Sequence, residues 1–198
     1  MRTFLATAIV GLMASFTDAA SHRGSCSDSG IAGASGFNIS TLSGRWYEIA
    51  RDSDFADTAN SCLVEDVTAS SGLLNVKSSG YTVAEGWQQK TVLAAQRNNG
   101  RAEFVTYTEG ETPDRSAATE VFILTGNASY LIEYLCYDLV PGYLYFDSIA
   151  VKARQPTLTD ATLSAITSLI ESRLPGYKAE SLYYNHQCSV CPFNTIPQ

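Results

Sequence analysis

Eight short strand-like runs follow one another along this sequence, separated by turn signals rather than helices. Strands at such close spacing form an antiparallel meander, and its two edges expose unpaired backbone groups unless the sheet closes on itself. A closed barrel of eight strands is just wide enough inside for packed side chains or one small ligand. The sequence therefore predicts an all-β fold, an eight-stranded antiparallel up-and-down β-barrel. The predicted strands cover 44–51, 62–69, 73–83, 87–97, 101–108, 119–125, 130–137 and 143–152.

The hydrophobic period changes after the last of these runs. Leu163, Ile166 and Ile170 recur at the spacing of one helical face. An amphipathic helix over 159–174 needs a large apolar partner surface, and the outer wall of the barrel is the surface that this fold offers. We therefore expect one C-terminal α-helix packed on the outer wall, followed by a short strand and a tail over 175–198.

Residues 1–19 have the pattern of a secretory signal peptide. Arg2 precedes an apolar stretch over 4–16 that is too short to span a bilayer, and small residues follow it. Cleavage after Ala19 is expected, because a cut one residue later would put the charged Asp18 at a recognition position. The protein is thus expected to be secreted and extracellular, with 20–198 as a single domain. Its parts would be the N-terminal arm, the barrel, the helix, and the C-terminal strand and tail, at 20–43, 44–154, 159–174 and 175–198.

The charge of the chain argues against several kinds of partner. Its net charge is −7, and its basic residues form no cluster. Nucleic acids and anionic membrane surfaces are therefore not expected as partners. After the first 19 residues no stretch approaches the ~20 apolar residues of a membrane-spanning helix. The oligomeric state stays open.

Five cysteines remain after the signal peptide, and in a secreted chain they indicate disulfides. Two of them form a C-x-x-C pair, which could serve redox chemistry or supply half a zinc site. That pair lies in a polar tail, and no second pair or paired histidine completes a metal site, so no metal is expected. The cysteines are Cys26, Cys62, Cys136, Cys188 and Cys191, and two glycosylation sequons begin at Asn38 and Asn127.

Several motifs in the expected order resemble the lipocalin family, in its apolipoprotein D-like branch with bilin- and carotenoid-binding relatives. Gly44-Arg45-Trp46 matches the family's G-x-W on the first strand, and Arg154 matches its arginine at the end of strand eight. The run "SYLIEYLC" matches a family pattern that ends here at Cys136, and the late helix and C-terminal cysteine also match. The second family motif, Thr-Asp-Tyr, reads Thr125-Gly126-Asn127 in this chain. The resemblance covers about 37–191 and implies the lipocalin barrel.

The resemblance also implies structural roles for the first and third motifs. Gly44 would let the chain turn tightly at the closed end of the barrel. Trp46 would plug the barrel floor and contact no ligand, and Arg154 would lie over its ring in a cation–π contact.

The family's disulfide pattern implies two bridges. One ties the N-terminal arm to strand seven, which here means Cys26 and Cys136. The other ties strand two to the C-terminal tail, which means Cys62 with either Cys188 or Cys191. Spacing after the helix favours Cys188, whereas the Cys191-Pro192 dipeptide favours Cys191.

These anchors set the phase of the strands, because successive strand residues point to opposite faces. If Trp46 faces inward, Glu48 and Ala50 share its face; if Cys136 faces outward, Glu133 faces inward. Matching to the family supplies the remaining positions. Glu133 then needs a partner, a water or a ligand donor, since a buried unpaired carboxylate is costly. The expected ligand-binding residues are Glu48, Val67, Phe104, Phe122, Leu131, Glu133, Phe146 and Ala150.

The sequence offers little for catalysis. His22 lies in the arm and His186 in the tail, and neither a G-x-S-x-G nor an H-E-x-x-H run is present. No catalytic residue is expected, so the chain is not interpreted as an enzyme. The resemblance implies a secreted binding and transport protein for a small hydrophobic ligand, such as a lipid, sterol, retinoid, carotenoid or bilin, with no cofactor beyond such a pigment or lipid. Two alternatives are a lipocalin-type isomerase that uses a cavity cysteine and a secreted defence or inhibitor protein that acts through its loops.

Overall fold

The computed structural model describes residues 21–52, 62–97, 100–108, 120–126, 129–185 and 191–197. Three sequence predictions fall outside these residues: the signal peptide, the sequon at Asn127 and any bond made by Cys188. In the part of the chain that is described, no helix is both long and apolar enough to cross a membrane.

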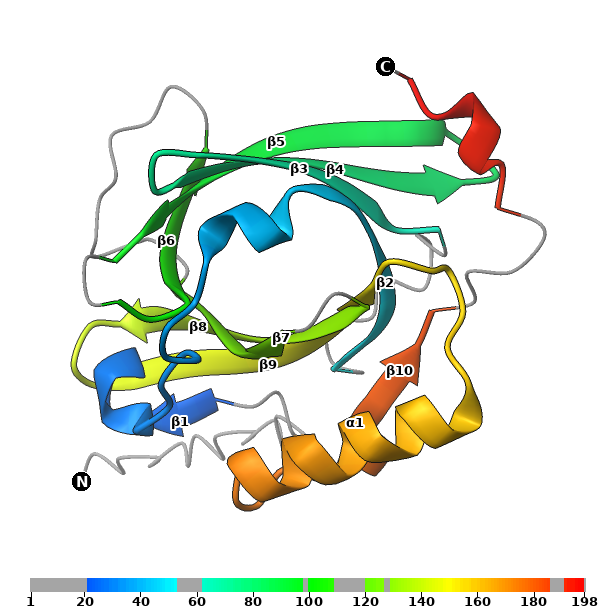
Figure 1. The fold of residues 1–198 in the computed structure, drawn as a ribbon. Helices are drawn as coiled ribbons and strands as arrows, with labels where there is room; N and C mark the ends of the chain where they lie inside the picture. Colours follow the sequence, from blue (N-terminus) through cyan, green and yellow to red (C-terminus); the bar gives the residue numbers. More distant parts are fainter. Residues whose placement is uncertain are drawn as a thin grey trace, which may run out of the picture.

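Eight strands form a closed ring, which confirms the predicted antiparallel barrel (Figure 1). Neighbouring strands pair antiparallel from β2 through to β9, and β9 pairs back with β2. The strands lie close to the predicted runs. Their bounds are β2 Gly44–Asp52, β3 Val64–Ser70, β4 Leu73–Thr82, β5 Gly86–Gln96, β6 Glu103–Thr108, β7 Glu120–Gly126, β8 Tyr130–Val140 and β9 Leu144–Ala153.

Two short strands extend the ring on its outside. β1 (Ser21–Arg23) pairs with β9, and β10 (Leu182–Tyr184) pairs with β2. The first lies in the predicted N-terminal arm, which therefore contributes to the sheet. Four short 3-10 helices complete the described elements, namely η1 Cys26–Ser29, η2 Ile39–Leu42, η4 Ala179–Ser181 and η5 Phe193–Thr195.

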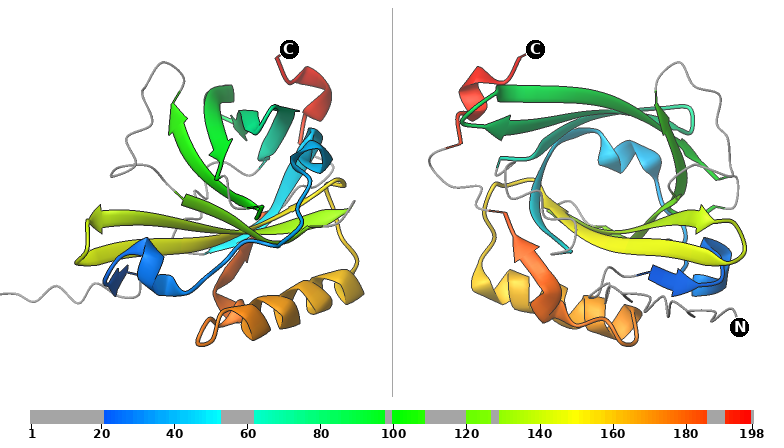
Figure 2. Two further views of the ribbon diagram at one scale, coloured as in Figure 1. Left: turned by 60° about the vertical axis from the view of Figure 1, so that its left-hand side comes forward. Right: turned by 180° about the vertical axis from the view of Figure 1, so that it is seen from behind.

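The helix α1 (Asp160–Arg173) packs against the outside of the barrel, as predicted (Figures 1 and 2). Thr159 caps its first turn by accepting a hydrogen bond from the backbone N–H of Thr162. Its residues Ile166 and Ile170 are buried in an apolar cluster with outward-facing residues of the barrel wall. This cluster, the outer core, contains Ile132, Ile149, Val151 and other side chains from β2 and β7–β9, so that part of the wall is buried on both faces.

Trp46 fills the floor of the barrel. The residue is 2% exposed, and its indole N–H donates to the carbonyl of Leu42 in η2 at 2.7 Å. The guanidinium carbon of Arg154 lies 3.6 Å from the centre of the tryptophan ring, which is the predicted cation–π contact. The same guanidinium donates to three backbone carbonyls around it, so it ties η2 and the start of β2 to the end of β9.

Gly44 is required by this closed end. Its φ of +103° belongs to the region that glycine adopts most easily. A side chain there would also place its Cβ 3.1 Å from a guanidinium nitrogen of Arg154. The G-x-W spacing thus lets the backbone turn and leaves room for the arginine over the ring.

Two disulfides hold the chain ends to the barrel. Cys26 of η1 is bonded to Cys136 of β8, as the family pattern implied. Cys62 is bonded to Cys191, which selects one of the two predicted partners. Beyond that bond, the ring of Phe193 contacts Tyr47 of β2 and Trp87 of β5, so the tail spans the strands between them.

Replacing the floor tryptophan should destabilise the whole barrel. We expect Trp46→Ala to lower the free energy of unfolding by about 3–5 kcal/mol, the usual cost of such a change in a core. Denaturant unfolding of the purified protein measures this loss. Trp87→Ala, at the half-buried second tryptophan, is the control and should cost clearly less. An equal or smaller loss at Trp46 would show that the floor is not a main source of stability.

Peptide mapping without reduction should recover two cross-linked pairs, one joining Cys26 to Cys136 and one joining Cys62 to Cys191. Each bond closes a long loop of chain, which makes it an effective constraint on the unfolded state. Recovery of a bond between Cys188 and Cys191, or of Cys62 bonded to Cys188, would contradict this pairing.

Candidate functional site

The barrel encloses a cavity of about 800 Å³, with Trp46 at its bottom. A volume of this size is typical of sites for small organic ligands, at roughly 300–1,000 Å³. Polar residues of β4 and β5, among them Ser79 and Lys90, line it toward the turn between those strands. Seven of the eight residues expected at the ligand site line this cavity, namely Glu48, Val67, Phe104, Leu131, Glu133, Phe146 and Ala150.

Phe122 does not line the cavity, so its predicted inward position is wrong. It lies in the outer core, where its ring packs against Tyr134 at 5.9 Å between centroids. Its neighbours Val121 and Ile123 line the cavity instead. This part of the wall is apolar on both faces, so the alternation of polar and apolar residues that reveals an exposed face is missing.

A bulge in β2 overturns a second phase assignment. The pairing of β2 with β9 shifts register between Glu48 and Ala50. A bulge inserts one extra residue and thereby reverses the face of the residues after it. Ala50 therefore lies in the outer core rather than on the face of Trp46, and Arg51 lines the cavity.

The cavity has an apolar half and a charged half. Strands β4–β7 form the apolar half with Val76, Val92, Ala94, Phe104, Val121 and Ile123. Polar residues of β4–β6 also line the cavity, namely Ser78, Ser79, Gln88, Gln89, Lys90 and Thr106. Among the lining residues that the structure describes, every charged side chain except Lys90 comes from the other four strands. These five interior charged residues, the polar network, are Glu48, Arg51, Glu65, Glu133 and Lys152.

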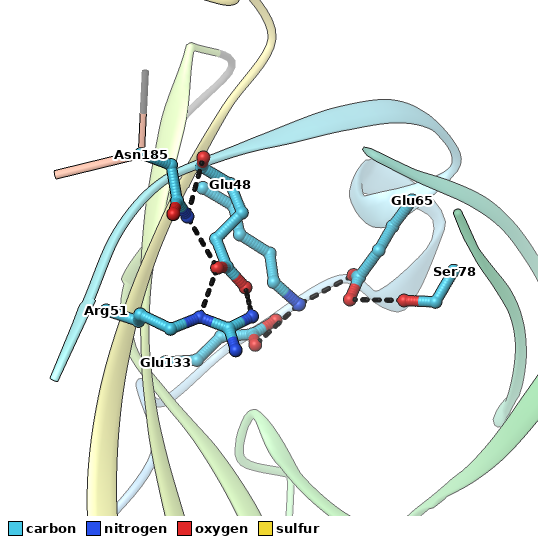
Figure 3. A network of polar contacts seen from close by, with 7 residues as sticks. Glu48, Arg51, Glu65, Ser78, Glu133 and Asn185 are labelled. Carbon is cyan, nitrogen blue, oxygen red and sulfur yellow. Dashed lines mark hydrogen bonds and ion pairs between the residues drawn. The ribbon is translucent and has the colours of Figure 1, made fainter. Parts of the chain in front are cut away.

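Lys152 joins two carboxylates of the polar network, those of Glu65 and Glu133, which are labelled in Figure 3. Its ammonium group lies 2.6 Å from Oε2 of Glu65 and 2.8 Å from Oε2 of Glu133. The hydroxyl of Ser78 donates to the other oxygen of Glu65 at 3.2 Å. Glu65 lies opposite Trp46 in the pairing of β3 with β2, so this group is close above the floor.

A second ion pair lies beside the first. The guanidinium of Arg51 donates to both oxygens of Glu48, at 2.5 and 2.6 Å, in a bidentate arrangement. The side-chain amide of Asn185 donates to Oε1 of the same glutamate at 2.7 Å (Figure 3). Glu48 is therefore compensated by groups that come from β2 itself and from the segment after β10.

Burial and neighbouring charges shift the protonation of this network. Burial raises the pKa of the Glu133 carboxyl; Lys152 opposes that rise, and the nearby Glu65 and Glu48 add to it. Burial alone would lower the pKa of Lys152, but Glu133 and Glu65 raise it above its ordinary value. Lys152 is thus held as an ammonium ion, which is not a nucleophile.

Sequence reasoning missed three members of the network. Lys152 follows Ala150 by two positions and Glu65 precedes Val67 by two, so the assigned strand phases already placed both inside. Lys152 is the partner that the carboxylate of Glu133 required. Arg51 could not be found in this way, because the bulge before it reverses the phase.

Comparison with known proteins gives matches in structure and none in sequence. No protein-family model matches the chain, and no curated protein matches it. Lobster apocrustacyanin A1 is similar in structure, with a TM-score of 0.65 and 18% identity over 80% of this chain and 84% of that one. The H1 crustacyanin of the lobster Homarus americanus has a TM-score of 0.66 and 17% identity, over 89% and 95% of the two chains.

An insect protein shows the same likeness. Insecticyanin from the tobacco hornworm Manduca sexta has a TM-score of 0.64 and 14% identity, covering 85% of this chain and 89% of that one. At such identities the likeness concerns the fold. The closed ring, the outer helix and these similar structures define the fold class. The chain has the lipocalin fold, as its motifs predicted.

Removing the charge of Glu133 should stabilise the protein at neutral pH. Burial raises the folded-state pKa of this group above its ordinary 4.5, so the native state binds the proton more readily than the unfolded chain. The free energy of unfolding therefore falls as the pH rises from the ordinary glutamate pKa of 4.5 through the raised pKa of Glu133 in the folded protein. Glutamine imitates the protonated acid, so Glu133→Gln should raise the free energy of unfolding at neutral pH.

Urea unfolding of both proteins at neutral pH and below the ordinary glutamate pKa measures this effect. The gain should disappear at the acid pH, where Glu133 is protonated in both states. Glu85→Gln, the same change at the exposed β4–β5 turn, is the control and should leave the free energy of unfolding nearly unchanged at both pH values. A loss of stability in Glu133→Gln at neutral pH would mean that the pair with Lys152 outweighs the cost of burial.

Proposed function

We propose that this chain is an extracellular carrier that binds one small hydrophobic molecule in its barrel cavity. The observation that supports this most directly is the cavity of about 800 Å³, closed below by Trp46 and lined on one side by the apolar Val76, Val92, Val121 and Ile123. Concave sites with an apolar wall and a few polar groups bind small molecules without reaction chemistry. The resemblance to the lipocalins suggests a lipid, sterol, retinoid, carotenoid or bilin as the class of ligand.

Several features support an extracellular location. The two disulfides are of the kind that persists in oxidising compartments. They agree with the secretory signal that the first 19 residues predict. Asn38, the sequon residue that the structure describes, is exposed and would be accessible to glycosylation.

The alternative of a cavity-cysteine isomerase receives little support. Cys62, the cysteine nearest to an inner strand, is bonded to Cys191 and offers no thiol. Lys152 is held protonated between two carboxylates. His22 lies outside the cavity, bonded to Asp147 and stacked on Tyr145. The described cavity thus favours a carrier over an enzyme.

Filling the cavity tests the proposal. Val92 lines the apolar half, whereas Leu93 lies on the other face of β5. We expect Val92→Trp to weaken binding of the neutral fluorescent probe N-phenyl-1-naphthylamine by at least about tenfold, since the indole occupies the ligand volume. Leu93→Trp, the same insertion on the outer face, should bind like wild type. Circular dichroism checks that both variants fold.

Equal probe affinity in wild type and a folded Val92→Trp would show that the probe binds elsewhere. The proposal that the barrel cavity is the ligand site would then be wrong. An absorbance spectrum of protein purified from its natural source adds an independent observation, because a carried pigment would absorb visible light.

A further inference from the structure

The polar network carries a surplus of one negative charge. Its described members are three carboxylates, Glu48, Glu65 and Glu133, and two cations, Arg51 and Lys152. Three negative and two positive groups sum to −1 when all are ionised. Lys90 also lines the cavity, but it is exposed near the β4–β5 turn, where solvent and salt screen its charge. The uncompensated charge therefore lies deep in the cavity.

Glu133 is the carboxylate best able to accept a further donor. Both oxygens of Glu48 accept from Arg51, and both oxygens of Glu65 have partners in Lys152 and Ser78. Among the described residues, Glu133 has one polar partner, Lys152, through Oε2. Its side chain keeps 13% exposure, and an ionised carboxylate offers about four acceptor positions. A donor that enters the cavity would find its acceptor there.

We propose that this cavity selects ligands with a cationic, hydrogen-bond-donating head on an apolar body, and that Glu133 is the counter-charge for that head. The ligand class is an amphiphilic amine. The ammonium group would lie among the carboxylates of the charged half, and the apolar body would lie against Val92, Val121 and Ile123. This inference rests on the proposed carrier function and names its preferred head group.

The same arrangement discriminates against fatty acids. A carboxylate ligand needs a cation, and Lys152 is already shared by Glu65 and Glu133. Arg51 is engaged in a bidentate pair with Glu48. An anionic head would bring a second surplus negative charge into a buried site, which is costly without a partner. Neutral alcohols should bind more weakly than amines and more tightly than fatty acids, since they donate one hydrogen bond and carry no charge.

Three probes of equal chain length separate these cases: decylamine, decanol and decanoate. Each is titrated at neutral pH against the full-length protein loaded with the neutral probe N-phenyl-1-naphthylamine. We expect decylamine to displace the probe about tenfold more tightly than decanol, as a charge-assisted hydrogen bond would produce, and decanoate to bind most weakly. Equal affinities, or tightest binding by decanoate, would overturn the inference and leave the carrier function intact. Failure of all probes to bind would overturn both.

The role of Glu133 is tested by an isosteric substitution. Glu133→Gln should reduce the advantage of decylamine over decanol to within about twofold, because glutamine keeps a hydrogen-bond acceptor and removes the charge. Glu85→Gln removes the same charge at the exposed β4–β5 turn and should keep the full advantage. If Glu133→Gln also keeps it, the acceptor lies elsewhere and the inference is wrong.

A pH series on the wild-type protein gives a test that requires no variant. Glu133 is faced by Lys152, Glu65, Glu48 and Arg51. As pH falls, this carboxylate takes up a proton while decylamine stays cationic. The advantage of decylamine over decanol should therefore shrink in acid and grow toward neutral pH. An advantage that is the same across the series would contradict the proposed counter-charge.

Discussion

The pairing of β2 with β9 is the contact on which the rest of the structure depends. It converts a meander with two exposed edges into a ring, and so creates the interior. The same pairing contains the bulge between Glu48 and Ala50, after which Arg51 points into the cavity beside Glu48. One nine-residue strand thus closes the barrel, supplies the floor tryptophan and compensates one of the buried carboxylates.

Closure alone would leave a tube, and two further features make it a one-ended cavity with a firm wall. Trp46 and Arg154 seal the bottom together with η2. On the outside, α1 and the disulfide-bonded N-terminal segment cover the outer face of β7–β9. Ile49 and Ala50 of β2 also lie in the outer core, so β2, β8 and β9 are packed from both faces. These three strands carry four of the five charged residues of the polar network, namely Glu48, Arg51, Glu133 and Lys152.

This double burial explains which parts of the molecule could be predicted from sequence. The barrel and the helix followed from strand spacing and hydrophobic period. The roles of Gly44, Trp46 and Arg154 and the bond between Cys26 and Cys136 followed from the resemblance to the lipocalins. The orientation of Phe122 could not be predicted, because apolar residues stand on both faces of β7. The inward turn of Arg51 depends on a bulge that is visible only in the pairing of two distant strands. The inward positions of Lys152 and Glu65 could have been predicted, since the phase assigned to their strands already placed both inside the barrel.

The polar network is better explained by the proposed carrier function than by the stability of the fold. Buried ion pairs stabilise proteins little, and apolar residues of similar volume often replace them without loss. A cavity without these charged residues would make a simpler barrel, but it would bind any apolar molecule with little preference. Lys152 holds two carboxylates close together on one side of the cavity, so the two sides of the interior differ in charge. A ligand can then be selected by its head group as well as by its bulk, and the cost of the buried charge falls on the unliganded protein.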